Sequence, residues 1–314
     1  MTGPLLLLAL LAVAAPAAAR PDPTAPGPYL VGTTTLAVSR PTAGGARRLD
    51  PVVWYPADVD GVDAAVRKGR HPVLVYSHGG CAYPEASSFL TRALASWGFV
   101  VVAPTHPGDT VLDPDSCDVV ELRAATLVER VADVRAVLDA LADEGRDPAS
   151  RLFRHLARSR IGVLGWSSGA STAIVAGRED PRVRAVLSLA PDARPERIGT
   201  DPVGAPTMVM EGVLDFYDPQ QTALDQAYGI LKAPRYAVEM QRTGHFAFSD
   251  LCVADLIGGI ECDPGTLTQD EAHRLVLRFA VPFLQRWVAG AKSWDRLLRP
   301  AANVDVELRA ERRR

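Results

Sequence analysis

The sequence predicts an α/β protein with a mainly parallel central sheet and helices on both faces. Short β-branched runs alternate with longer segments whose apolar residues recur every three or four positions, as strands and helices do in such folds. Several short runs are apolar at consecutive positions, which is typical of strands that helices cover on both sides. At 314 residues, the chain is long enough to bury the core of one such domain.

Six short runs have the composition of buried strands. They are 52–55, 73–76, 100–103, 161–164, 186–189 and 207–210. Residues 236–240 are also strand-like and run into a loop. Parallel sheets bind their ligands at the carboxyl ends of the strands, so we expect the functional residues directly after these runs.

Three segments have the pattern of helices that bury one face. The clearest is 119–142, and a second is expected over 85–97. The apolar stripe of the first consists of Leu127, Val131, Val134, Leu138 and Leu141. The third, 268–288, begins with Thr268 and has Glu271 three residues later, which is the pattern of a capping box.

The N-terminal residues have the pattern of a secretory signal peptide. Residues 5–15 form an apolar run shorter than the roughly 20 residues that span a bilayer, and a proline and three alanines follow it. We expect a signal peptide over 1–19, a Pro-rich leader over 20–28 and a single domain over 29–314. No cysteine follows the apolar run closely, so the mature protein is expected in the periplasm or outside the cell, with neither a lipid anchor nor a stable membrane span.

An exported protein is expected to use its four cysteines in disulfides. Cys252 and Cys262 are close in sequence with two glycines between them, which suits a small closed loop, and Cys81 then remains to pair with Cys117. Four cysteines allow three pairings, and the alternative is that some are free buried thiols.

The composition excludes several classes of protein. With 47% hydrophobic and 23% charged residues, the chain is neither disordered nor a multi-span membrane protein. The net charge is −3 and the Arg-rich end, 311–314, is too short for an arm that binds nucleic acid. No cluster has the spacing of a zinc site, and no metal or organic cofactor is implied. The oligomeric state stays open.

The pentapeptide Gly-Trp-Ser-Ser-Gly at 165–169 matches the G-x-S-x-G pattern between a predicted strand and a predicted helix. In so sharp a turn, a side chain at either glycine would collide with the neighbouring strand or helix. The serine at the centre of the turn is pushed out where ligands reach it. Ser167 is therefore the predicted nucleophile, and the backbone N–H of Ser168 is well placed to face a developing oxyanion.

A serine nucleophile needs a histidine as general base and a carboxylate that orients the histidine. In folds with this turn the chain order is serine, acid, histidine, which leaves only His245 and His273 of the six histidines. We interpret His273, within the last predicted helix, as a helix-surface residue. His245 lies in the loop after strand 236–240 and is the predicted base.

The acid is expected between Ser167 and His245, at the end of a strand. Asp215 follows strand 207–210 and is preferred, with Asp218 as the alternative. Glu211, still at the strand end, could equally be a structural carboxylate with hydrogen bonds.

A second oxyanion donor is expected in the loop after strand 73–76. The sequence there is Ser77-His78-Gly79-Gly80-Cys81, and its glycines let backbone N–H groups approach a substrate oxygen closely. Gly80 is the predicted donor and Cys81 the second choice. His78 is interpreted as a residue that orients the loop.

Together these motifs resemble the α/β-hydrolases, and most of all the bacterial group of platelet-activating-factor acetylhydrolases, predicted dienelactone hydrolases and polyester-degrading cutinases. The resemblance covers about residues 29–288 and rests on 76–80, 94–101, 165–169, Gly212 with Asp215 and Pro219, and 244–246. It implies an α/β-hydrolase fold in which Ser167 is the nucleophile, Asp215 the acid and His245 the base. The backbone N–H groups of Gly80 and Ser168 would form the oxyanion hole.

The predicted function is cleavage of carboxylic esters through an acyl-enzyme, on small-molecule or lipid-like esters of the short-chain or acetylhydrolase-like kind. The alternatives are a cutinase-like polyesterase or lipase and, in a different class, a non-catalytic binding protein with an α/β-hydrolase fold. Trp166, Phe246 and Phe248 are interpreted either as the lining of an acyl pocket or as packing residues. The segment 250–262 is interpreted either as a disulfide-tied flap over the site or as a surface loop.

Overall fold

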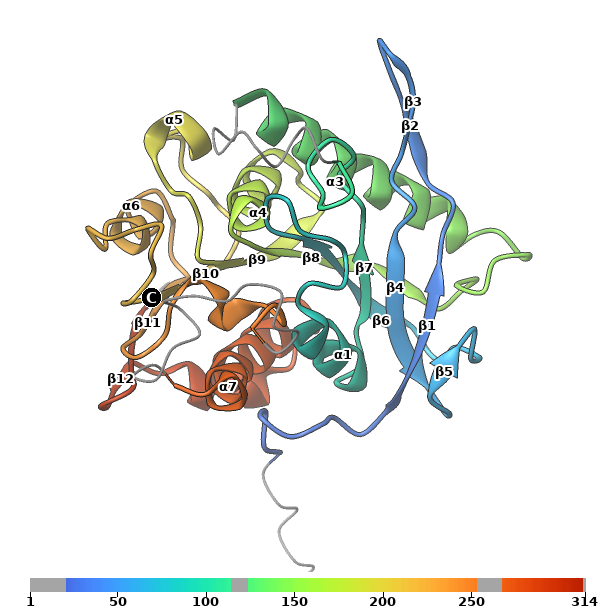
Figure 1. Ribbon diagram of the computed structural model, residues 1–314. Helices are drawn as coiled ribbons and strands as arrows, with labels where there is room; N and C mark the ends of the chain where they lie inside the picture. The colour runs from blue at the N-terminus through green and yellow to red at the C-terminus, as the bar shows by residue number, and fades with distance from the viewer. Residues whose placement is uncertain (1–20, 114–123, 253–266, 313–314) are drawn as a thin grey trace, which may run out of the picture.

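The computed structural model describes residues 21–113, 124–252 and 267–312. These residues form an 11-stranded sheet in the order β12-β13-β11-β10-β9-β8-β6-β7-β4-β1-β5 (Figure 1). The centre of the sheet is parallel and helices cover both faces, which confirms the predicted fold class.

The parallel centre of the sheet contains the strands that the sequence predicts best. They are β6 (His71–Ser77), β7 (Val100–Ala103), β8 (Leu156–Trp166), β9 (Val183–Leu189), β10 (Thr207–Gly212) and β11 (Arg235–Met240). Among themselves these six strands pair only in parallel. Most of their residues are buried, because both faces of these strands pack against helices. Their carboxyl ends therefore meet at one edge of the sheet.

Further strands, all antiparallel pairs except that of β1 with β5, extend the sheet on both sides, and of these only β4 was predicted. On one side β4 (Val52–Ala57) pairs with β7 and with β1 (Leu30–Thr35), and β1 also carries β5 (Gly61–Val62). On the other side β13 (Val306–Glu311) pairs with β11 and with β12 (Ala301–Ala302). A separate hairpin, β2 (Ser39–Thr42) and β3 (Gly45–Arg48), projects from the molecule (Figure 1).

Two layers of helices complete the fold (Figure 1). One face of the sheet packs against α1 (Ser88–Ser96) and α7 (Gln269–Trp287), the other against α3 (Ala124–Glu144), α4 (Ser168–Glu179) and the short α6 (Ala223–Gly229). The shorter elements are α5 (Pro195–Ile198), η1 (His245–Phe248) and η3 (Lys292–Leu298). The capping box predicted for the last helix is confirmed, because Thr268 and Glu271 each accept a hydrogen bond from the backbone N–H of the other.

Several predictions fall on residues outside the described ranges. These are the signal peptide at 1–19, residues 119–123 of the longest predicted helix, most of the segment 250–262, and two of the four cysteines, Cys117 and Cys262. Cys81 and Cys252 are both disulfide-bonded, and their predicted pairing with those two cysteines stays a prediction. Among the described helices, none is both long and apolar enough to cross a membrane.

Candidate active site

Ser167 occupies a strained turn between the end of β8 and the first residue of α4. Its φ is 56° and its ψ is −122°, a combination that a residue with a Cβ rarely adopts. A Cβ on Gly165 would lie 2.2 Å from the carbonyl oxygen of Gly169, and a Cβ on Gly169 would lie 1.9 Å from that of Ser77. The steric need for both glycines, predicted from the sequence, is confirmed.

Asp215 and His245 form a hydrogen-bonded pair at the same edge of the sheet. Asp215 follows β10 and His245 begins η1 after β11, and the distance from His245 Nδ1 to Asp215 Oδ2 is 2.7 Å. Since an ionised carboxylate only accepts, Nδ1 carries the proton and Nε2 is left as the acceptor. Burial acts to raise the pKa of Asp215, but hydrogen bonds from His245 and from the backbone N–H of Tyr217 hold it below its ordinary value.

Glu211 lies at the end of β10, behind Asp215. Burial raises the pKa of Glu211 well above its ordinary value, and a hydrogen bond with Asp215 and the charge of Asp215 add to this effect. Two ionised carboxylates cannot hydrogen-bond to each other, so a Glu211 that stays protonated is the donor in its hydrogen bond with Asp215. Glu211 is a buried acid that supports Asp215 from within the sheet.

The alternative acid, Asp218, has a different contact. Its carboxylate accepts the backbone N–H of Ala223 at 2.7 Å and the hydroxyl of Thr222 at 3.2 Å, so it caps the start of α6. Asp218 therefore stabilises α6 as a helix cap. The hydrogen bond to His245 Nδ1 is made by Asp215 instead.

His273 is buried, so the prediction that it lies on the surface of the last helix is wrong. Its ring stacks on Phe89 of α1 at 3.5 Å between centroids, and its Nε2 is 3.0 Å from the carbonyl oxygen of Ser249. The face of α7 that carries it packs against α1. These contacts give His273 a role in packing.

Trp166 connects the serine turn to the histidine loop. Its indole Nε1 donates to the carbonyl oxygen of His245 at 2.9 Å, and the two rings are 5.4 Å apart. Because Trp166 directly precedes Ser167, this contact holds the imidazole near the serine turn. The described residues include no hydrogen bond between the Ser167 hydroxyl and His245. In sites without substrate such catalytic hydrogen bonds are often long and shorten when substrate binds.

The loop after β6 lies against the serine turn and offers the second oxyanion donor. A Cβ on Gly79 would lie 2.8 Å from the Trp166 ring, which shows how closely the loop approaches. The N–H of Cys81 donates to Asp109 Oδ1 at 3.0 Å, so Cys81, the second choice for a donor, is already engaged. The N–H of Gly80 makes no hydrogen bond with another described residue. Ser168 begins α4, so its N–H has no partner within the helix.

A buried polar cluster beneath this loop was missed by the sequence analysis. Ser77 Oγ lies 2.9 Å from His106 Nε2, and His106 Nδ1 lies 2.9 Å from Asp133 Oδ2. The connectivity repeats that of a serine–histidine–acid triad, but none of the three side chains is accessible to a substrate. Burial, followed by the charge of Arg130, lowers the pKa of His106 to about 4. This cluster supports the loop and is no second active site.

Apolar side chains border the candidate site. Leu214, Phe216 and Tyr217 flank Asp215 and are 47%, 63% and 61% exposed. The ring of Tyr217 lies 4.6 Å from that of His245 and 6.4 Å from that of Phe246. An ester that approaches His245 therefore meets an apolar and partly aromatic surface.

Of the three predicted pocket residues, only Phe246 is partly exposed. Trp166 and Phe248 are buried, and Phe248 packs in the core against α1 and α7. Neither therefore contributes surface to an open pocket. Trp166 acts instead through its hydrogen bond to the His245 loop.

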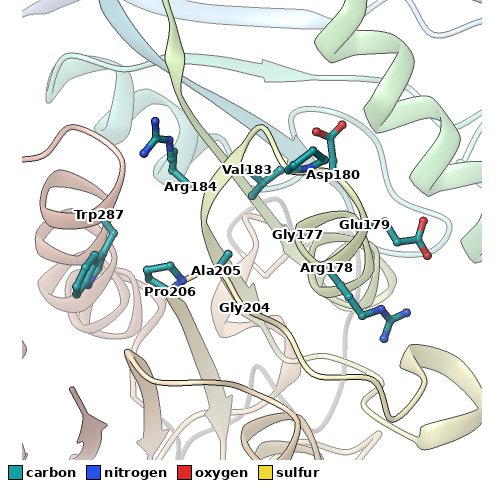
Figure 2. Close-up of a pocket in the computed structure, with 11 residues that line it drawn as sticks. Gly177, Arg178, Glu179, Asp180, Val183, Arg184, Gly204, Ala205, Pro206 and Trp287 are labelled. Carbon is teal, nitrogen blue, oxygen red and sulfur yellow. The ribbon is translucent and has the colours of Figure 1, made fainter. Parts of the chain in front are cut away.

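A surface hollow of about 550 Å³ lies away from these residues (Figure 2). It is bordered by the end of α4 and the residues at the start of β9 and β10, with Arg178, Arg184 and Trp287 around it. These are the amino ends of parallel strands, so the hollow is at the opposite edge of the sheet from Ser167 and His245. None of Ser167, Asp215 and His245 lines this hollow. The described residues contain no group of three or more His, Cys, Asp or Glu that could hold a metal ion.

The turn, the paired acid and histidine and the sheet order define a protein of the α/β-hydrolase fold. A solved ferulic acid esterase from Streptomyces cinnamoneus has this fold with a TM-score of 0.74 and 22% identity, and the match covers 90% of this chain and 98% of that one. Residues 13–312 match the family model described as PETase, PET hydrolase-like. The chain belongs to this PET hydrolase-like family, which confirms the predicted superfamily.

Two curated relatives are named as enzymes that act on esters or lipids. Lipase 1 of Moraxella sp. (strain TA144) is 26% identical over 221 residues, and the bis(hydroxyethyl) terephthalate hydrolase of Streptomyces coelicolor (strain ATCC BAA-471 / A3(2) / M145) is 27% identical over 228 residues. Each match covers 70% of this chain, and the chain spans 59% and 62% of the length of these relatives. The predicted ester hydrolase agrees with the names of these relatives and of the family.

Proposed function

We propose that the protein is an exported serine hydrolase that cleaves carboxylic esters through an acyl-enzyme. The observation that supports this most is the buried hydrogen bond between Asp215 and His245 beside the strained turn of Ser167. The three residues come from the carboxyl ends of β8, β10 and β11, where parallel sheets bind their ligands. The names of the relatives, a lipase, a terephthalate ester hydrolase and a ferulic acid esterase, fit the same reaction.

The proposed reaction begins when His245 Nε2 removes the proton from the Ser167 hydroxyl, whose oxygen attacks the ester carbonyl carbon. The resulting oxyanion accepts hydrogen bonds from the N–H groups of Gly80 and Ser168, each of which contributes roughly 3–4 kcal/mol. The carboxylate of Asp215 stabilises the imidazolium. His245 then gives its proton to the leaving alcohol, and a water molecule releases the acid from Ser167 by the same route.

For the substrate we propose small esters with a short or an aromatic acyl group. The short chain follows from the resemblance to acetylhydrolases. The aromatic group follows from the position of Tyr217 and Phe246 beside His245, and from the terephthalate and ferulate named for two relatives. The exposed Leu214 and Phe216 favour a second candidate, an enzyme that acts on the apolar surface of a polyester or a lipid droplet.

A panel of p-nitrophenyl esters from acetyl to palmitoyl, together with bis(hydroxyethyl) terephthalate, a dispersed polyester and an emulsified triglyceride, tests the proposal. We expect the rate to peak at short chains and on the terephthalate diester. Higher rates on dispersed polyester or emulsion would favour the second candidate.

The variant Ser167→Ala is expected to lose at least about a thousandfold in kcat. Ser171→Ala is the matched control, because this serine lies in the first turn of α4, close to Ser167 in sequence, but hydrogen-bonds to the carbonyl oxygen of Asp192 outside the site. A loss of only a few-fold in Ser167→Ala would contradict its role as nucleophile.

A further inference from the structure

Arg130 is a fully buried arginine of α3 that lies beneath the loop after β6. Its Nε donates to Asp109 Oδ2 at 2.7 Å, its Nη1 to the carbonyl oxygen of His78 at 2.7 Å, and its Nη2 to that of Gly79 at 3.1 Å. The guanidinium has no exposed surface. Since a buried ion pair adds little net stability, the stability of the fold alone does not explain this arginine.

The contacts of Arg130 and Asp109 hold three consecutive peptide groups of the loop. The carbonyl groups of His78 and Gly79 point toward the guanidinium, and the N–H of Cys81 points toward Asp109. Both held carbonyls belong to trans peptides, in which the N–H points opposite to the carbonyl group. The N–H of Gly80 therefore points away from the buried cluster.

We propose that Arg130 is a positioning residue for the oxyanion hole, which fixes the peptide between Gly79 and Gly80 so that the Gly80 N–H faces the developing oxyanion. This role rests on the proposed acyl transfer at Ser167. Two adjacent glycines have no side chains to hold their peptide groups, and glycine rotates more freely than any other residue. A donor fixed before the reaction stabilises the transition state without reorganisation.

The rest of the cluster keeps the guanidinium in place. Ser77 Oγ accepts from Arg130 Nη1 at 3.3 Å and lies 2.9 Å from His106 Nε2, and His106 in turn binds Asp133. Arg47 binds the same Asp133 at 2.9 Å but contacts no residue of the glycine loop. The chain therefore offers a matched control: a partly exposed arginine that binds Asp133 and the carbonyl oxygen of Pro107 but does not touch the loop.

The test compares Arg130→Lys with Arg47→Lys in the full chain. Lysine keeps the charge, but its single nitrogen cannot occupy the three separate positions from which the guanidinium nitrogens bind Asp109, His78 and Gly79. We expect Arg130→Lys to lower kcat by about 10- to 100-fold with KM within about twofold. Inhibition by a trifluoromethyl ketone, whose adduct with Ser167 carries an oxyanion, should weaken by a similar factor. For Arg47→Lys, kcat is expected to stay within about twofold.

The outcomes separate positioning from stability, since melting temperatures are measured for both variants. A folded Arg130→Lys with unchanged kcat and ketone inhibition overturns the proposal, and so does an equal loss in Arg47→Lys. If Arg130→Lys does not fold, Asp109→Asn serves instead, because it removes the charge that anchors Nε but keeps an oxygen for Cys81. Parallel losses of kcat and ketone inhibition are again expected, and their absence overturns the role.

Ser167→Ala separates this proposal from the proposed function. Turnover that persists in Ser167→Ala refutes the acyl-enzyme and, with it, the reason for an oxyanion hole. Loss of turnover there, together with no effect of Arg130→Lys, refutes only the positioning role.

Discussion

Acidification is expected to destabilise the protein through His106. Burial and then the charge of Arg130 lower the pKa of His106 from 6.5 to about 4, so the folded imidazole stays neutral at a pH where the unfolded chain binds a proton. Its contribution to stability is therefore present above about pH 6.5 and is lost as the pH falls toward 4. With about 1.4 kcal/mol for each pKa unit, the free energy of unfolding falls by about 2 kcal/mol between pH 7 and pH 5 and by about 3 kcal/mol at pH 4.

Urea unfolding of the wild type and His106→Asn at pH 7 and pH 5 measures this loss. The asparagine amide can donate to Asp133 in place of Nδ1 but does not titrate, so the variant should be less stable at pH 7 and should lose about 2 kcal/mol less on acidification. His78 is present in both proteins, and burial also lowers its pKa well below the ordinary value. His155→Asn is the control, because His155 lies outside the cluster and bonds to the carbonyl oxygen of Gly69. Equal losses in the wild type and His106→Asn would refute the reasoning.

Four further predictions concern single residues near the site. Asp215→Asn is expected to lower kcat on p-nitrophenyl acetate by about 10⁴-fold, because His245 loses its orienting carboxylate. Asp218→Asn should keep most activity and change the free energy of unfolding little, because asparagine caps a helix about as well as aspartate, and the reverse pattern of activity would reassign the acid. Burial and then Asp215 raise the pKa of Glu211, so the contribution of Glu211 is present at low pH and is lost as the pH rises through its folded pKa. Glu211→Gln should therefore flatten the loss of stability that begins as the pH rises above the ordinary pKa of 4.5, and a curve that matches the wild type would contradict this. Gly169→Ala is expected to fold poorly, since its Cβ would lie 1.9 Å from a backbone oxygen, and a thermal melt like that of the wild type would show the collision to be relieved.

The central strands could be predicted from the sequence because they are buried on both faces. All four residues of β7 are buried, and the apolar run at 100–103 predicts its bounds. The outer strands β1 and β13 could not, because their burial is partial and their residues include threonines or charges. Each is held in the sheet by pairing with a neighbouring strand. For β13 this neighbour is β11, and the chain returns to it only after α7.

The candidate triad could be predicted because its chemistry is tied to local sequence. A turn that needs glycine at 165 and 169 fixes the serine between them, and the order of strands leaves few choices for the acid and the base. The polar cluster has no such local pattern, since Ser77, His106 and Asp133 meet only when α3 packs on the sheet. The available signal was that Arg130 and Asp133 stand among the apolar residues of the α3 stripe.

Two features that lower the stability of the fold lie close together at this site. Ser167 has a strained backbone with φ at 56°, and Arg130 is a charge without exposed surface. An apolar side chain of similar volume in place of a buried ion pair is often neutral or stabilising, so a core selected for stability alone has no need of Arg130. Its contacts end on the carbonyl groups of His78 and Gly79, which form the loop that faces the serine turn. The strained turn fixes the hydroxyl of Ser167, and the buried charge of Arg130 fixes the N–H of Gly80. Both groups are therefore in place before the substrate binds.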